Sequence, residues 1–241
     1  MTAAHLVLDD VSKSFGALRV VDGVSLRVGA GETLGVLGPN GAGKTTLFNL
    51  ISGDVRADGG RIVLEGRDVT RQPPHRRCRL GIGRSYQIPK PWGAMTVFEN
   101  LVAAASFGAG KAELDTYPRA VEILRQTGLL GQANRPAAAL RLLDRKRLEL
   151  ARALATEPRV LLLDEIAAGL TEGEAAVLVE ELRRIKAAGL TMIWIEHVVH
   201  ALLAVADRLL VMSQGRPLAE GPPASVMADP EVRRVYLGLE A

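Results

Sequence analysis

Short apolar runs recur along the chain and predict strands. Residues 24–28 alternate between apolar and polar positions, which is typical of a strand with one buried face. Residues 33–37 and 160–163 are continuous apolar runs of the kind found in strands buried on both faces. Further strands are expected at 6–8, 61–66, 81–87, 190–195 and 208–212.

Helical patterns fill most of the remaining chain. They cover residues 96–105, 117–127, 144–155, 172–188 and 198–205, with short helices after Pro222-Pro223. The first begins with the capping-box pair Thr96 and Glu99. Because helices dominate from 96 to 156 and strands flank this block, we predict one α/β domain over 1–241, with a core made of 1–87 and 157–241 and a helical subdomain at 88–156.

A glycine-rich loop joins the apolar run 33–37 to a helical pattern. It consists of Gly38, Pro39, Asn40, Gly41, Ala42, Gly43, Lys44, Thr45 and Thr46. Such glycines let backbone N–H groups turn inward around a phosphate, and the following helix directs its positive end toward it. Lys44 would reach the β- and γ-phosphates and Thr45 would bind Mg²⁺. The alternative, a flexible glycine turn beside a solvated lysine, is disfavoured because the flanking strand and helix are those that a P-loop requires.

Polar residues follow four predicted strands, and parallel strands bring such residues to one crevice. These residues are Lys44, Gln87, Asp164 and His197. Asp164 suits an outer ligand of Mg²⁺, and Glu165 beside it suits the general base that activates water. Without a P-loop, the Asp-Glu pair would more often be a helix cap and His197 a surface histidine. With a P-loop present, we favour roles in phosphoryl transfer.

Phe15 is an aromatic residue in a polar segment about two dozen residues before the P-loop. Two interpretations stay open from the residues alone, a core phenylalanine or a ring that stacks on the nucleotide base.

Composition narrows the function less than these motifs do. The 241 residues are 48% hydrophobic, and 30 basic against 27 acidic residues give a net charge of +3. The basic clusters are scattered, so we expect no nucleic-acid partner. Cys78 is the only cysteine, which excludes an internal disulfide. We expect no signal peptide and no membrane-spanning segment, so work at a membrane would require docking onto a protein that spans it.

The motifs resemble those of the ATP-binding cassette (ABC) ATPases over nearly the whole chain. The matching residues are Phe15, Gly38 to Thr45, Gln87, Asp164-Glu165, Ala168-Gly169-Leu170-Thr171 and Glu196-His197. Other segments resemble the ATP-binding subunits of bacterial branched-chain amino acid importers and their urea or amide relatives. These are Leu34 to Asn40, Pro74-His75-Arg76, Gly83 to Gln87, Met95 to Leu101 and Ala219 to Pro222.

The resemblance implies a fold, a site and partners. The fold would be a RecA-like P-loop core with an antiparallel β subdomain and an inserted helical subdomain. Phe15 would be the A-loop aromatic, Gln87 the Q-loop residue linking Mg²⁺ to the permease-facing subdomain, Asp164 the Walker B aspartate, Glu165 the catalytic base and His197 the γ-phosphate switch. ATP and Mg²⁺ would be the cofactors. Transmembrane permease subunits, a second ATPase and indirectly a substrate-binding protein would be the partners, at the cytoplasmic face of the plasma membrane.

One motif departs from the family pattern. The signature, normally close to Leu-Ser-Gly-Gly-Gln, is replaced here by Leu140, Arg141, Leu142, Leu143 and Asp144. In the family this element contacts the γ-phosphate bound to the opposite subunit, and Leu143 in place of glycine would obstruct close backbone approach. A smaller departure is Ile166, where proline usually follows the glutamate. We therefore predict a heterodimer with a second ATPase that has an intact signature, or an altered variant of an ordinary subunit.

Two other functions remain as alternatives. A non-transport ABC ATPase of DNA repair or translation would usually carry paired cassettes or a long coiled-coil insert, and neither fits in 241 residues. A regulatory subunit that binds nucleotide but barely hydrolyses it is favoured by the altered signature and disfavoured by Glu165 and His197.

Overall fold

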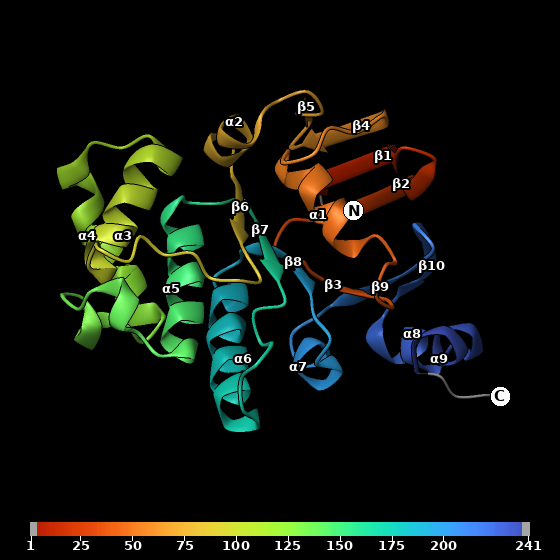
Figure 1. Ribbon diagram of the computed structural model, residues 1–241. Helices are drawn as coiled ribbons and strands as arrows, with labels where there is room; N and C mark the ends of the chain where they lie inside the picture. Colours follow the sequence, from red (N-terminus) through yellow and green to blue (C-terminus); the bar gives the residue numbers. More distant parts are fainter. Residues whose placement is uncertain (1–3, 238–241) are drawn as a thin grey trace.

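Helix α1 (Lys44–Ser52) lies between two β-sheets (Figure 1). The computed structural model describes residues 4–237. Leu47 and Phe48 of α1 belong to one buried cluster with side chains from both sheets. The helix that follows the predicted P-loop is therefore held on two sides.

The larger sheet has six strands in the order β10-β9-β3-β8-β7-β6. All neighbouring pairs are parallel except β10 with β9. The strands are β3 (Thr33–Leu37), β6 (Ile82–Ser85), β7 (Val160–Asp164), β8 (Thr191–Ile195), β9 (Arg208–Ser213) and β10 (Arg216–Gly221). The parallel strands end at one edge, where the polar residues of the motifs follow them.

The smaller sheet is antiparallel, in the order β2-β1-β4-β5. Its strands are β1 (Ala4–Phe15), β2 (Leu18–Gly29), β4 (Gly59–Leu64) and β5 (Arg67–Asp68). Its apolar face covers α1 on the side away from the larger sheet.

Alternation within the buried strands directs their side chains to opposite layers, because successive residues of a strand point to opposite faces. In β8, Ile193 packs in the cluster that contains α1, whereas Met192 and Trp194 pack in the cluster formed with the outer helices. A continuous apolar run is therefore what a strand covered on both faces requires.

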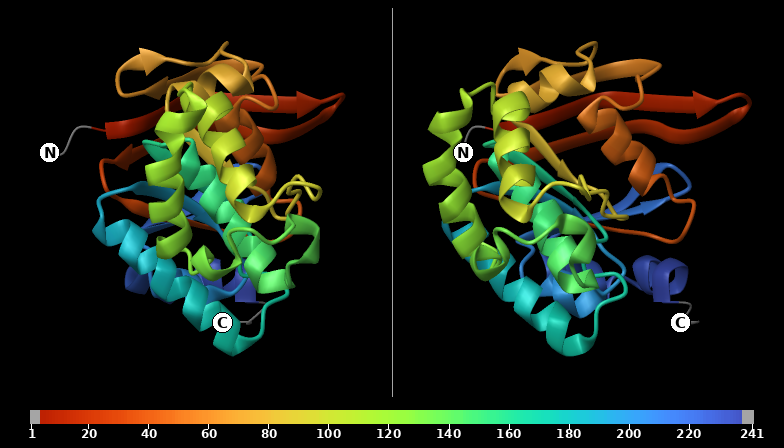
Figure 2. Two further views of the ribbon diagram at one scale, coloured as in Figure 1. Left: turned by 90° about the vertical axis from the view of Figure 1, so that its left-hand side faces the viewer. Right: turned by 60° about the vertical axis from the view of Figure 1, so that its left-hand side comes forward.

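The helices of residues 97–155 stand on one side of the larger sheet (Figures 1 and 2). They are α3 (Val97–Ala104), a π-helical turn (Ala105–Ala109), α4 (Glu113–Gln126) and α5 (Leu142–Ala155), with short 3₁₀ turns at Leu130–Gln132 and Ala137–Ala139. The capping box at Thr96 and Glu99 is present. The remaining helices are α2 (Pro74–Arg79), α6 (Glu172–Ala187), α7 (Val199–Leu203), α8 (Pro223–Ala228) and α9 (Pro230–Leu237).

The structure confirms the predicted elements and changes several bounds. The strand expected at 6–8 extends over Ala4–Phe15, and the strand expected at 61–66 is Gly59–Leu64. The strand expected at 81–87 ends at Ser85, so Gln87 lies two residues beyond it. The expected helix 117–127 begins earlier, at Glu113, and 198–205 shortens to Val199–Leu203.

Candidate functional site

The P-loop connects β3 to the first residue of α1, Lys44. Gly38 and Gly43 have φ angles of 148° and 97°, which L side chains rarely adopt. A Cβ at Gly38 would overlap the carbonyl oxygen of Met212, and one at Gly43 would overlap that of Val20. Only glycine fits these two positions, because distant backbone segments press on the loop.

Lys44 is buried against the loop that precedes it. Its Nζ donates hydrogen bonds to the carbonyl oxygens of Gly38 at 2.6 Å and Pro39 at 3.0 Å. Burial lowers the pKa of Lys44, while the carboxylates of Glu165 and Asp164 act in the opposite direction. The next residue, Thr45, is exposed in the first turn of α1. The loop therefore combines a positive charge, a helix start and an accessible hydroxyl, as a phosphate site requires.

Glu165 meets two other predicted site residues. The Nε2 atom of Gln87 donates a 2.5 Å hydrogen bond to Oε2 of Glu165, and Nε2 of His197 lies 3.0 Å from Oε1. Glu165 itself has a positive φ of 47°, just past the end of β7. Side chains that follow β6, β7 and β8 thus converge at one place, as predicted from the strand ends.

Asp164 is the last residue of β7 and is almost fully buried. Its Oδ2 accepts a 2.9 Å hydrogen bond from Arg84, whereas Oδ1 is buried without a hydrogen-bond partner. Burial raises the pKa of this carboxyl, and the Arg84 guanidinium opposes that effect. Residues 4–237 contain no cluster of three or more His, Cys, Asp or Glu side chains that would hold a metal by themselves. The free Oδ1 atom of Asp164 and the hydroxyl of Thr45 are oxygen donors that fit Mg²⁺, which proteins commonly bind through one or two carboxylates together with phosphate oxygens.

Sequence reasoning assigned no role to two residues that hold the backbone of this cluster. The buried ammonium of Lys146, in α5, donates to the carbonyl oxygens of Gln87 at 2.9 Å and Glu165 at 3.2 Å. Glu196 is fully buried and accepts hydrogen bonds from the N–H groups of Ala167 and His197, both at 3.0 Å. Charged residues in apolar surroundings are a signal for such roles, but their partners are distant in sequence.

Phe15 is the last residue of β1, and its ring is half-exposed. The ammonium of Lys13 lies 5.4 Å from the ring centroid. Phe15 pairs with Leu18 at the end of the hairpin formed by β1 and β2. Leu18 is two residues before Val20, whose carbonyl oxygen lies against Gly43 of the P-loop. Phe15 is therefore not a core phenylalanine, and stacking on a nucleotide base stays a prediction.

The altered signature forms the start of α5. Arg141 is the N-cap residue and makes no side-chain capping bond, so the first turn has no capping hydroxyl. Leu142 is 44% exposed, and Asp144 is 3.5 Å from Arg147. The helix start thus presents an apolar and a cationic side chain.

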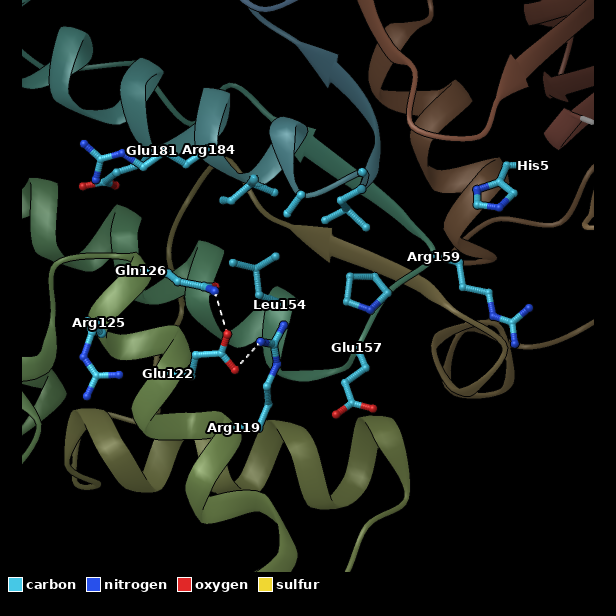
Figure 3. Close-up of a pocket in the computed structure, with 15 residues that line it drawn as sticks. His5, Arg119, Glu122, Arg125, Gln126, Leu154, Glu157, Arg159, Glu181 and Arg184 are labelled. Carbon is cyan, nitrogen blue, oxygen red and sulfur yellow. Dashed lines mark hydrogen bonds and ion pairs between the residues drawn. The ribbon is translucent and has the colours of Figure 1, made fainter. Parts of the chain in front are cut away.

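A cavity of about 830 Å³ (Figure 3) has none of the residues of this cluster in its lining. Leu154, Pro158, Ile185 and Leu190 contribute to its lining, with charged residues of α4 and α6 around them. Pro158 and Leu190 precede β7 and β8, so the cavity is at the opposite ends of the strands from the P-loop.

More than half of the chain matches a known protein family. Residues 21–168 match the model of a family described as ABC transporter. The chain belongs to the ABC transporter family. Residues 216–241 also match a C-terminal model described as branched-chain amino acid ATP-binding cassette transporter. Membership of the ABC transporter family implies that the chain binds ATP and, in general, that it is an ATPase.

Three relatives of this ABC family member extend over most of its length. A probable ABC transporter ATP-binding protein of Azorhizobium caulinodans is 40% identical over 95% of this chain and 82% of its own. A high-affinity branched-chain amino acid transport ATP-binding protein of Salmonella typhimurium is 36% identical over 99% of both chains. The crystal structure of an ABC transporter cassette in its ADP conformation is 34% identical, with a TM-score of 0.89 over 99% of this chain and 100% of that one. The expected ABC ATPase fold is confirmed.

Proposed function

We propose that this chain binds and hydrolyses ATP as the energy-supplying subunit of an ABC importer for branched-chain amino acids or similar small polar solutes. The observation that carries the hydrolytic part is the position of Glu165, whose two carboxylate oxygens contact Gln87 and His197. The solute class follows from the C-terminal match and from the Salmonella typhimurium relative.

The P-loop would hold the triphosphate. Backbone N–H groups from Gly38 to Thr46 would surround the phosphates at the start of α1, and Lys44 would neutralise the β- and γ-phosphates. Phe15, on the exposed end of the β1–β2 hairpin, would stack on the base. These roles use the loop conformation that the glycines at 38 and 43 permit.

Mg²⁺ would be held by Thr45, Asp164 and Gln87. When bound, the ion would neutralise charge on the phosphates. Glu165 would accept a proton from the attacking water, and His197 would hold the glutamate and contact the γ-phosphate.

The partners follow from the same assignment. Residues 4–237 include no helix that is long and apolar enough to cross the bilayer. Transmembrane permease subunits would bind the chain at the cytoplasmic face of the plasma membrane, and a substrate-binding protein would act with the permease on the other side. A second ATPase with an intact signature would complete the site built on Lys44 and Glu165. If the altered signature abolished ATP hydrolysis, the chain would instead be a subunit that only binds nucleotide.

Uptake and nucleotide binding test the proposal together. In cells with the complete transporter, Lys44→Ala should reduce uptake of labelled leucine to background, and the purified variant should lose affinity for ATP. Lys111→Ala is the matched control, because this exposed lysine forms an ion pair with Glu157 at the surface. Normal ATP affinity in Lys44→Ala would contradict the nucleotide site. Loss of ATP affinity without any effect on leucine uptake would instead contradict the solute class.

A further inference from the structure

The guanidinium of Arg84 joins the P-loop helix to the predicted metal carboxylate. Arg84 belongs to β6, and its side chain is 7% exposed. One terminal nitrogen donates to Oδ1 of Asn49 at 2.6 Å, to Oγ of Ser52 at 3.1 Å and to Oδ2 of Asp54 at 3.0 Å. The other donates to Oδ2 of Asp164 at 2.9 Å.

Two aromatic rings lie next to this guanidinium. Its central carbon lies 5.9 Å from the ring centroid of Phe48 in α1 and 4.8 Å from that of Tyr86. A planar guanidinium held by rings and by several acceptors has little freedom to rotate. The position of Asp164 Oδ2 is thereby tied to α1.

The two carboxylate oxygens of Asp164 differ in their hydrogen bonding. Oδ2 is engaged by Arg84, whereas Oδ1 is buried with no partner. A buried acceptor without a hydrogen bond costs free energy unless another group satisfies it. A cation beside the phosphates would satisfy it.

We propose that Arg84 is a positioning residue for Mg²⁺, which acts by holding Asp164 so that Oδ1 faces the metal. This inference rests on the proposed function, because it assumes that ATP binds at the P-loop with Mg²⁺. The role needs the forked shape of the guanidinium, since one terminal nitrogen serves the α1 side and the other serves Asp164. A lysine ammonium has the same charge but cannot reproduce this pair of directions.

The test separates geometry from charge by comparing Arg84→Lys with Arg84→Met. The purified full chain is titrated with a fluorescent ATP analogue in EDTA, and then with Mg²⁺ at a fixed analogue concentration. Mutation of a group that orients a metal ligand typically weakens metal affinity by about 10–100-fold. We expect Arg84→Lys to raise the half-saturating Mg²⁺ concentration by about tenfold and to leave the affinity in EDTA unchanged. Arg61→Lys, in an exposed pair with Asp9, is the matched control and should behave as the original protein.

Each outcome has a distinct meaning. If Arg84→Lys behaves as the original protein and only Arg84→Met differs, the guanidinium acts as a charge and the positioning role is wrong. If Arg84→Lys weakens binding equally in EDTA and in Mg²⁺, Arg84 supports the fold and not the metal, which also overturns the inference. If the original protein binds the analogue equally well with and without Mg²⁺, the metal part of the proposed function fails as well. Should Arg84→Met not fold, Arg84→Lys alone still decides between these outcomes.

Discussion

His197 and Glu165 lie side by side, with 3.0 Å between Nε2 of the imidazole and Oε1 of the carboxylate. The other carboxylate oxygen accepts a hydrogen bond from Gln87. Each oxygen can accept a further hydrogen bond, so a water molecule can reach Glu165 while both partners stay in place. Gln87 and His197 together therefore restrain the side chain that we propose as the general base.

Glu165→Gln tests the role of this carboxylate. The amide keeps the size of the side chain but cannot accept a proton, so turnover should fall by about 100-fold or more, while ATP affinity is retained. Steady-state phosphate release and equilibrium nucleotide binding in the assembled complex measure the two quantities. Glu172→Gln, in the first turn of α6, is the control. Full turnover in Glu165→Gln would show that another group activates the water.

Restoring the signature tests the effect of residues 141 and 143. Arg141 occupies an N-cap position with extended backbone, which serine favours, so Arg141→Ser with Leu143→Gly should fold. ATP turnover in the complete transporter should rise, since the helix start regains a hydroxyl and close backbone approach. Arg141→Ala with Leu143→Ala is the control that removes bulk without supplying the hydroxyl. Unchanged turnover in the restored protein would contradict our interpretation of the signature.

Arg77 is expected to be a main contributor to stability near the P-loop helix. The residue is 1% exposed, and its guanidinium donates to the carbonyl oxygens of Leu50 and Ile51 at the end of α1, and of Thr70 and Gln72. Burial lowers its pKa to about 10, so it remains charged at pH 7. Arg77→Met would leave these acceptors unpaired and should reduce the free energy of unfolding by about 3 kcal/mol. Urea unfolding against the exposed neighbour variant Arg76→Met measures the loss; equal stabilities would refute it.

The capping box of α6 predicts a dependence of stability on pH. Hydrogen bonds from the N–H and hydroxyl of Thr171 lower the pKa of Glu174 below its ordinary 4.5. A carboxyl with a lowered folded pKa stabilises the fold above its unfolded pKa, and the contribution is lost as the pH falls through the folded value. Glu174→Gln should therefore reduce stability at pH 7 and flatten the decline below about pH 4.5. Melting temperatures from pH 3 to 7 would show this, and a profile parallel to that of the original protein would contradict it.

The sequence was sufficient where chemistry and pattern are local. The larger sheet could be predicted from the apolar runs of β3, β7 and β8. The cluster around Glu165 could be predicted from the P-loop glycines and from the polar residues that follow these strands. The strand β10 was missed because Arg216–Gly221 is a half-exposed edge strand that contains Pro217 and has no regular alternation. The extension of β1 to Phe15 was missed because irregular pairing interrupts the alternation after Leu8.

The partners of the buried cations Arg84 and Lys146 could not be predicted from the sequence. Arg84 and Asp164 are 80 residues apart, and Lys146 is 59 residues from Gln87. Such pairs are set by strand order and helix packing, which no local pattern contains. The position of Arg84 within a predicted strand was a weak signal, because an arginine there could equally have belonged to an exposed edge.

The close approach of Val20 and Gly215 to Gly43 has a consequence for inherited variation in this chain. A side chain at Gly43 or at Gly215 would collide with the same Val20 carbonyl, and Gly215 accepts a hydrogen bond from Asp22. The stretches around Val20, Gly43 and Gly215 therefore fix the shape of the P-loop together, although Gly215 lies far from the other two in sequence. Damage to the hairpin or to the turn after β9 would silence the protein while every recognisable nucleotide motif remained intact.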